Sequence, residues 1–167
     1  MRRPTAPRPS QASDPPGRAK AGGLLPPTYL FMALAAQAGL HLFAPGPRLL
    51  TWPWRAAGIV LLAAGVGLNL SADRALKRVR TTVRPDEPVG ALVDRGAYRV
   101  SRHPMYLGFV LLAAGVAMLL GTSTPWLAVA GLALVLEFAF IRPEERAMDA
   151  AFGEQWRAYR ARVRRWV

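Results

Sequence analysis

The chain has 167 residues and a formal net charge of +12, yet 52% of its residues are hydrophobic and none is cysteine. This length suits a single domain, and the lack of cysteine excludes disulfides, thiolate metal sites and a cysteine nucleophile. Three stretches, 24–47, 56–72 and 104–136, contain no charged side chain. Uncharged runs of this length are typical of membrane-spanning helices, because a hydrocarbon core of about 30 Å needs about 20 helical residues.

The chain begins with a basic segment, residues 1–23, that is rich in proline, arginine, alanine and serine. It has too few apolar residues to form a core, so we expect it to be disordered. Residues 24–167 are then expected to form one domain. The first apolar run predicts a span near 27–44, and we interpret it as a membrane anchor rather than a cleaved signal peptide, because it has no clear small-residue cleavage site.

The remaining apolar runs predict three further spans, the first of them near 53–70. The run over 104–136 would be about 50 Å long as one helix, which is longer than a single crossing needs. Small and polar residues at 121–125 favour a turn inside it, which gives spans near 105–120 and 125–141. The sequence therefore predicts an all-α integral membrane protein with about four transmembrane helices. Small residues spaced four apart predict close helix packing at Ala35 and Gly39, at Ala63 and Gly67, and at Ala113, Ala117 and Gly121.

Lysine and arginine follow this predicted topology. They gather in residues 1–23, in 71–104 and in the tail from Arg142, whereas the loop between the first two spans and its flanks hold only Arg48 and Arg55. Cytoplasmic segments of membrane proteins collect these residues, so we expect both termini in the cytoplasm. Because the basic residues follow the predicted topology rather than one patch, the high net charge does not require a nucleic-acid partner to explain it. The alanine-, arginine- and glycine-rich composition indicates a high-GC bacterium, so we expect a bacterial inner membrane.

The C-terminal segment predicts a basic, amphipathic helix over 143–165 at the membrane interface. Pro143 suits the first turn of a helix. Apolar and aromatic residues recur behind it at helical spacing: Met148, Phe152, Trp156, Tyr159, Val163 and Trp166. The arginines lie largely off this stripe, as in helices that rest on a membrane surface, so the tryptophans are expected to contact the interface. Gly153 weakens the helix and is expected to mark a bend.

A helical hairpin turning at 121–125 would return its two ends to the same membrane face, and both ends carry polar residues. Pro104 is placed as the first helical residue, so the free backbone N–H groups there can bind an anion. Charged or aromatic side chains flank it: Tyr98, Arg99, Arg102, His103 and Tyr106. Glu144 and Glu145 come from the far end and can accept hydrogen bonds from hydroxyls or an ammonium group. Such a site suits a zwitterionic ligand with an aromatic ring; S-adenosylmethionine is one, although the residue types alone do not single it out.

Several motifs in this region resemble the isoprenylcysteine carboxyl methyltransferase family and its bacterial relatives, within the wider group that includes phospholipid N-methyltransferases. The matching elements are Gly96-Ala-Tyr-Arg99, Ser101-Arg-His-Pro-Met-Tyr-Leu-Gly108, the Glu144-Glu145 pair, and Phe152-Gly153 followed by Trp156, Tyr159 and Val163. Their order and spacing fit the family over about half of the chain. The sequence departs from the pattern at Ala97, where the family often has proline.

The resemblance implies a helical membrane enzyme that binds S-adenosylmethionine at the cytoplasmic end of its last two spans and releases S-adenosylhomocysteine. The candidate cofactor-binding residues are Tyr98, Arg102, His103, Pro104, Tyr106, Leu107, Gly108, Glu144 and Glu145. The acceptor would be a carboxylate, thiol or amine on a lipophilic small molecule or a lipid-anchored substrate in the membrane. No residue is assigned as a general base.

Three further residues are candidates for contact with the substrate: Glu137, Arg142 and Tyr159. Glu137 would lie about one turn inside the membrane, where ionisable residues are often functional, or it would pair outward with Arg142. No metal site is expected, because the two histidines, His41 and His103, belong at opposite membrane faces. Two alternatives remain: a non-catalytic membrane scaffold with a lipid-binding basic tail, and a membrane reductase of unsaturated lipids.

Overall fold

The structure is a computed structural model that describes residues 24–82 and 92–167. The predicted disordered segment 1–23 therefore lies outside the described residues. Every named element of the described part is a helix: α1 (Pro26–Phe43), η1 (Trp54–Ala56), α2 (Ala57–Thr82), η2 (Gly96–Arg99), α3 (Pro104–Leu120), α4 (Pro125–Val135), η3 (Leu136–Ile141) and α5 (Arg142–Arg162). Because all of these elements are helical, the predicted all-α class is confirmed for this part of the chain.

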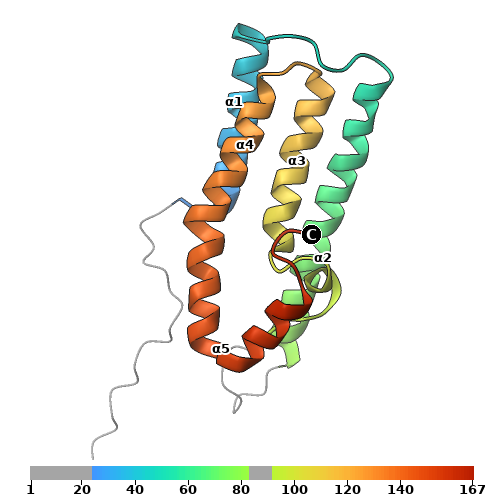
Figure 1. Cartoon of the computed structure of the whole chain (residues 1–167). Coiled ribbons are helices and arrows are strands. Elements are labelled where there is room, and N and C mark those ends of the chain that lie inside the picture. Colours follow the sequence, from blue (N-terminus) through green and yellow to red (C-terminus); the bar gives the residue numbers. More distant parts are fainter. Residues whose placement is uncertain (1–23, 83–91) are drawn as a thin grey trace, which may run out of the picture.

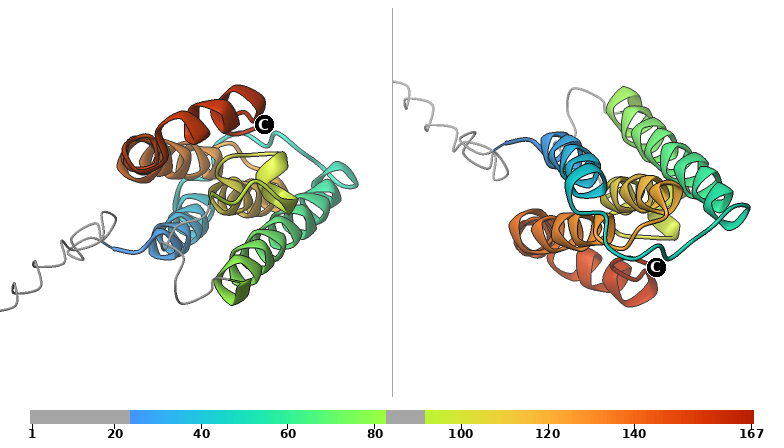
Figure 2. Two further views of the ribbon diagram at one scale, coloured as in Figure 1. Left: turned by 90° about the horizontal axis from the view of Figure 1, so that it is seen from below. Right: turned by 90° about the horizontal axis from the view of Figure 1, so that it is seen from above.

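The bundle is built around α3, with α2 along one side and α1 and α4 along the other (Figures 1 and 2). α3 and α4 form the predicted hairpin. Its turn begins at Gly121, which ends α3 in the left-handed conformation with φ of 73°. The backbone N–H groups of Leu49 and Leu50 donate to the Gly121 carbonyl, which holds the α1–α2 loop against this turn. The N-terminus of α3 lies at the opposite end of the bundle, where α5 passes beneath it (Figure 1).

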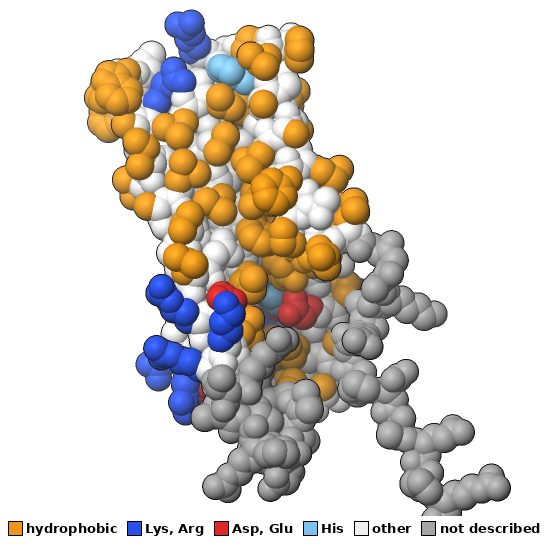
Figure 3. Space-filling view, turned by 180° about the vertical axis from the view of Figure 1, so that it is seen from behind, with side chains coloured by type: hydrophobic (Ala, Val, Ile, Leu, Met, Phe, Trp, Pro, Cys, Tyr) orange, Lys and Arg blue, Asp and Glu red, His pale blue; other side chains and the backbone are white. Residues whose placement is uncertain are grey.

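Among the described residues, two helices are long and apolar enough to cross a membrane, namely Trp54–Arg78 and Pro125–Arg162. α3 is apolar but shorter. Hydrophobic side chains cover the middle of the bundle on the face shown in Figure 3, and charged side chains lie toward its ends. This distribution is the one that a membrane-embedded bundle requires, because charged groups are costly within the hydrocarbon core.

Glycines let α2 and α3 approach closely at two levels. A Cβ on Gly58 would lie 2.5 Å from the carbonyl oxygen of Gly115, and one on Gly65 would lie 2.8 Å from that of Gly108. Such distances are too short for any side chain, so both contacts require glycine or a shift of the backbone. These contacts fix the position of α3, and hence of its polar N-terminus, against α2.

The packing faces only partly match the predicted ones. Ala113 and Ala117 are fully buried in the core, as expected. Gly39 and Gly67 have no other heavy atom within 4 Å of an added Cβ, so the prediction that they mediate close packing was wrong. The buried face of α2 instead contains Gly58 and Gly65, which are spaced seven residues apart.

The tail departs most from the prediction. α4, η3 and α5 form one continuous helix, whereas we expected a separate tail helix to begin at residue 143. A π-helical turn, η3, ends at Ile141, two residues before Pro143, whose ring would clash with the carbonyl four residues earlier in a regular α-helix. Gly153 has φ of 50° and bends α5, as predicted. The helix ends at Arg162 rather than at residue 165, and residues 163–167 turn back toward α3.

Trp156 and Tyr159 lie inside the protein after this bend. They are 3% and 2% exposed, respectively, so the expectation that Trp156 contacts the membrane interface was wrong. These two residues of the apolar stripe are buried because the chain beyond the Gly153 bend packs against η2, through Tyr98, and against the loop before α3, through Arg102.

Candidate cofactor site at the N-terminus of α3

The loop that precedes α3 is fixed by hydrogen bonds from both sides. The Ser101 hydroxyl accepts a hydrogen bond from the backbone N–H of His103 at 3.1 Å and donates to the carbonyl of Arg165 at 3.0 Å. The backbone N–H of Arg102 donates to the carbonyl of Arg164 at 3.0 Å. Pro104 begins the helix, as predicted. The loop and the tail therefore hold each other in place around the first turn of α3, whose free N–H groups attract anions.

Glu145 is the carboxylate at the centre of the site and is 7% exposed. Arg165 pairs with both of its oxygens, at 2.6 and 3.2 Å. Arg102 Nη2 lies 3.3 Å from Oε1, and His103 Nε2 lies 3.4 Å from the same oxygen. Burial alone would raise the pKa of Glu145, but the hydrogen bonds from Arg165 and the charge of Arg102 outweigh it and lower the pKa. Glu145 is therefore ionised, and the side chains around it occupy its oxygens.

The guanidinium of Arg102 has unused hydrogen-bonding capacity. Its side chain is 8% exposed and lies over the Trp156 ring at 5.9 Å from the centroid. Nη2 contacts Glu145, but the buried Nε and Nη1 atoms have no partner among residues 24–82 and 92–167. Buried polar groups normally have partners, and an unpaired one costs about 1–3 kcal/mol. The protein therefore leaves the hydrogen-bonding capacity of these two buried donors unused among the described residues.

His103 and Tyr106 form an aromatic surface beside this anion site. Their rings stack at a centroid distance of 5.8 Å and an interplanar angle of 17°. Burial lowers the pKa of His103, so the imidazole is neutral at pH 7. Glu144 Oε2 lies 3.7 Å from its Nδ1, and the partial burial of Glu144 raises its pKa. The Glu144 side chain is 42% exposed, so it is the more accessible of the two carboxylates.

Tyr98 and Tyr159 connect two elements next to the site, η2 and α5. The buried Tyr159 hydroxyl donates to the Tyr98 carbonyl at 2.7 Å and so links α5 to η2. Burial raises the pKa of each phenol to about 12, so both are neutral. This contact gives Tyr159 a structural role in the described state.

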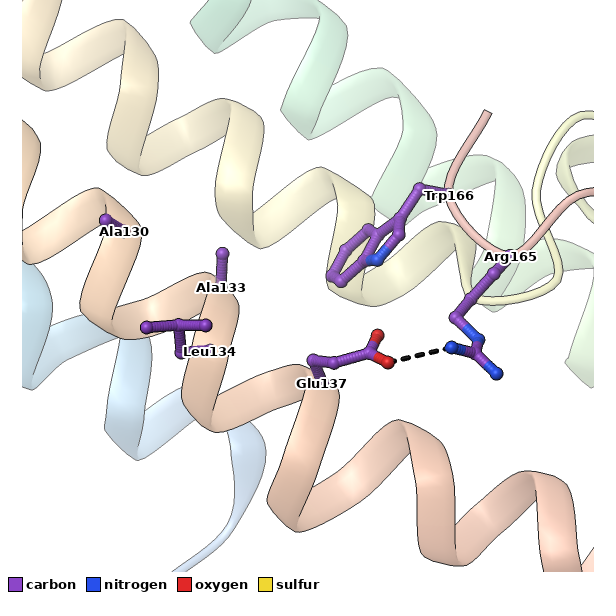
Figure 4. A pocket seen from close by; sticks show the side chains of 6 residues that line it. All are labelled: Ala130, Ala133, Leu134, Glu137, Arg165 and Trp166. Atoms are coloured by element: carbon purple, nitrogen blue, oxygen red, sulfur yellow. Dashed lines mark hydrogen bonds and ion pairs between the residues drawn. The ribbon is translucent and has the colours of Figure 1, made fainter.

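An apolar groove of about 570 Å³ runs along α4 and ends at the site. Its lining residues are Ala130, Ala133, Leu134, Glu137, Arg165 and Trp166 (Figure 4). Glu137 lies at the polar end of the groove, where its Oε1 accepts from Arg165 at 2.8 Å and from Arg142 at 3.0 Å. Arg165 therefore bridges Glu137 in the groove and Glu145 in the site.

A family model described as phospholipid methyltransferase matches residues 54–155, which is more than half of the chain. The chain belongs to the phospholipid methyltransferase family. It is also 36% identical to an uncharacterized protein of Haemophilus influenzae over 63 residues, which cover 38% of this chain and 100% of that protein. No solved structure matches the chain. Family membership makes the protein a membrane methyltransferase in general terms and confirms the wider group that the motifs resembled.

In this phospholipid methyltransferase family member, the structure gathers most of the predicted cofactor residues within one region. Tyr98, Arg102, His103, Pro104, Tyr106, Glu144 and Glu145 lie around the N-terminus of α3. Leu107 is half-buried in the first turn of α3. Gly108 instead faces α2, where a Cβ would meet the Asn69 amide and the Gly65 carbonyl. Among the described residues, no group of three His, Cys, Asp or Glu side chains could hold a metal ion.

Three residues that take part in the site were not predicted to do so: Ser101, Arg165 and Trp166. Ser101 belongs to the motif before α3, but a serine hydroxyl there has no distinctive pattern. Arg165 and Trp166 looked like ordinary parts of a basic amphipathic tail. Only the return of the tail to α3 reveals what they contact.

Proposed function

We propose that the protein is an S-adenosylmethionine-dependent methyltransferase that acts on a lipophilic acceptor in the membrane. The observation that carries the proposal is Arg102, which lies in the loop directly before α3 and has a buried guanidinium with two donors that have no partner among the described residues. A methyltransferase needs a pocket for the carboxylate of the methionine part of its cofactor. Arg102 and the first turn of α3 offer the charge and the donors for that carboxylate.

Other residues of the site suit the remaining parts of the cofactor. The partly exposed carboxylate of Glu144 can accept hydrogen bonds from an ammonium group or from ribose hydroxyls. The stacked rings of His103 and Tyr106 offer an aromatic face to an adenine or a sulfonium. Glu145, whose oxygens are already occupied, positions Arg102 and His103. When bound, S-adenosylmethionine would supply a methyl group on a positive sulfur, and a nucleophile would displace S-adenosylhomocysteine from it.

The groove along α4 supports a lipophilic acceptor, because its apolar wall leads from the membrane-facing part of the bundle to Glu137 and Arg165. The chain's own task is then to align the acceptor with the methyl group and to exclude water. We further propose an isoprenylcysteine carboxyl methyltransferase-like member with a carboxylate, thiol or amine acceptor. Four spans, namely α1, α2, α3 and α4 with η3, would place the site at the cytoplasmic face of a bacterial inner membrane.

The test is calorimetric titration of the purified full chain with S-adenosylhomocysteine. Arg102→Lys keeps the positive charge but removes the planar array of donors, and Arg99→Lys is the matched control on the exposed side of η2. We expect saturable binding that Arg102→Lys weakens by about 10- to 100-fold, equivalent to losing charge-assisted hydrogen bonds of about 1.5–3 kcal/mol. Arg99→Lys should bind like the wild type.

Two results would count against the proposal. Equal weakening by both variants would show that Arg102 has no specific contact. A folded wild-type protein that binds no S-adenosylhomocysteine in detergent or in lipid would exclude the cofactor. Two hypotheses would then remain to be tested: a membrane scaffold with a lipid-binding tail, and a reductase of unsaturated lipids, which would depend on a hydride donor.

A further inference from the structure

Glu137 uses only one of its two carboxylate oxygens within the described parts of the chain. Its Oε1 atom accepts from Arg165 at 2.8 Å and from Arg142 at 3.0 Å. The buried Oε2 atom has no hydrogen-bond partner in residues 24–82 and 92–167. The side chain is 14% exposed and lines the groove, where it points toward Arg165 and Trp166 (Figure 4). A buried carboxylate oxygen without a partner is uncommon, and a ligand that donates a hydrogen bond to it would satisfy it.

The backbone places Glu137 at the polar end of the groove. It is the second residue of η3, and π-helical turns are rare and occur frequently at functional sites. The apolar lining lies on α4, one and two turns before Glu137, at Ala130, Ala133 and Leu134. A hydrocarbon chain that lies along these three residues would bring its polar end to Glu137.

The charges around Glu137 restrict the group that this end can bind. Arg165 also lines the groove, so the groove ends at a carboxylate next to a guanidinium. Ion pairs extend from there into the cofactor site in the order Arg142, Glu137, Arg165, Glu145 and Arg102. This series connects three arginines with two glutamates, so it has an excess of one positive charge.

Such an arrangement distinguishes between three kinds of acceptor group. A carboxylate would be repelled by the second oxygen of Glu137. An ammonium group would be attracted to that oxygen, but it would enter a series of ion pairs that already has an excess of positive charge. A neutral S–H or phenolic O–H group suits both neighbours, because it can donate to Oε2 and accept from a guanidinium. As the group loses its proton, the arginines stabilise its growing negative charge.

We propose that Glu137 is a catalytic residue that accepts the proton of a neutral thiol or phenolic hydroxyl in the groove, and that this class of acceptor is methylated in preference to carboxylates and amines. A lone pair of the acceptor sulfur or oxygen forms the bond to the methyl carbon. The bond from that carbon to the sulfonium breaks, and its electron pair stays on the sulfur of S-adenosylhomocysteine. The acceptor's proton passes to Glu137 Oε2 and then to water. The inference rests on the proposed function, which supplies the methyl donor.

The first test measures methyl transfer by the full chain to four acceptors with the same ten-carbon chain: decanethiol, 4-decylphenol, decanoate and decylamine. We expect the thiol and the phenol to have the highest kcat/KM. Glu137→Gln should lower kcat/KM for both by about 100-fold or more, because the amide oxygen stays with the arginines and the NH₂ group that replaces Oε2 cannot accept a proton. Glu154→Gln makes the same change at an exposed position of α5 and should have no effect.

A more acidic acceptor separates proton transfer from a general loss of structure. 4-Decylbenzenethiol is largely ionised at neutral pH, whereas decanethiol is not, so the arenethiol has little need of a proton acceptor. We therefore expect Glu137→Gln to lower kcat/KM much less for the arenethiol than for decanethiol. Equal losses for the two thiols would show that Glu137 has a structural role only, and would overturn the proposal.

The hydrogen bond to Oε2 can also be measured without methyl transfer. The probes are 4-decylphenol and its methyl ether, which lacks the O–H group, in calorimetric titrations of the cofactor-free full chain. The wild type should bind the phenol about 10- to 100-fold more tightly than the ether, as expected for one hydrogen bond to a charged group. Glu137→Gln should lose this preference, and Glu154→Gln should keep it.

Three other results would overturn the proposal: a higher kcat/KM for decanoate or decylamine than for the thiol and the phenol, no methylation of the thiol or the phenol, or unchanged activity in Glu137→Gln. Titration of the same samples with S-adenosylhomocysteine separates this inference from the proposed function. If the cofactor binds but the thiol and the phenol are not methylated, the acceptor class alone is rejected. If the wild type does not bind the cofactor, the proposed function itself is rejected.

Discussion

Removal of the Arg165 guanidinium should destabilise the protein, because this side chain links the tail to two carboxylates. In the structure it contacts Glu145 at 2.6 and 3.2 Å and Glu137 at 2.8 Å. Arg165→Met keeps an unbranched side chain of similar length and removes every donor. The variant would leave Glu145, which is 7% exposed, with only Arg102 and His103 as partners.

The magnitude follows from the partial burial of the pair. Breaking a fully buried ion pair costs about 3–5 kcal/mol, whereas an exposed pair contributes about 0–1 kcal/mol. The Arg165 side chain is 32% exposed and that of Glu145 is 8% exposed, so the pair lies between these limits. Since Glu145 keeps two partners, we expect a loss of about 2 kcal/mol, or about 4–8 °C in Tm for a chain of this length.

The assay is thermal unfolding of the wild type, Arg165→Met, Glu145→Gln and the double variant, with Arg164→Met as the control. Arg164 contributes only its backbone carbonyl to the tail contact, and its side chain is exposed. A double-mutant cycle should give a coupling of about 1–2 kcal/mol between Arg165 and Glu145. Zero coupling, or an equal loss in Arg164→Met, would refute the role that we assign to this ion pair.

Two further predictions concern packing and pH. Gly115→Ala should cost about 1–3 kcal/mol of stability, because its methyl group would lie 2.8 Å from the Gly58 carbonyl oxygen. Gly131→Ala is the control: its methyl group would meet nothing within 4 Å, so we expect it to be neutral or stabilising. Chemical or thermal unfolding of both variants measures the difference. Burial lowers the pKa of His103 below its unfolded value, so its contribution to stability is present above about pH 6.5 and is lost as the pH falls through the folded pKa. Tm measured from neutral to acidic pH should therefore fall more steeply in the wild type than in His103→Gln, and parallel curves would contradict this assignment.

The positions of the helices near the site could be predicted because local chemistry sets them. Pro104 has the fixed φ that suits the first residue of α3, and Gly121 adopts the left-handed conformation that ends it. With both ends fixed, the apolar hairpin had to return Glu144 and Glu145 toward His103. The approach of the two glutamates to His103 is the part of the site that follows from sequence alone.

The face of α2 that packs against α3 could not be predicted in this way. α2 carries two stripes of small residues, one with Ala63 and Gly67 and the other with Gly58 and Gly65. Either stripe permits close approach of a neighbouring helix. The choice depends on where α3 places Gly108 and Gly115, and this is a property of two helices together rather than of either sequence.

The tail shows why the set of site residues predicted from the sequence was incomplete. A helix that lies on a membrane and a helix that folds back onto its own protein both need one apolar stripe and basic residues beside it, so periodicity cannot separate them. The bend at Gly153 could be predicted, but the contacts that decide the outcome have no sequence signal: the carbonyls of Arg164 and Arg165 accept hydrogen bonds from the Arg102 N–H and the Ser101 hydroxyl. Once those bonds form, Arg165 must lie beside Glu145, and a side chain that resembled a membrane-surface charge becomes the link between the groove and the site.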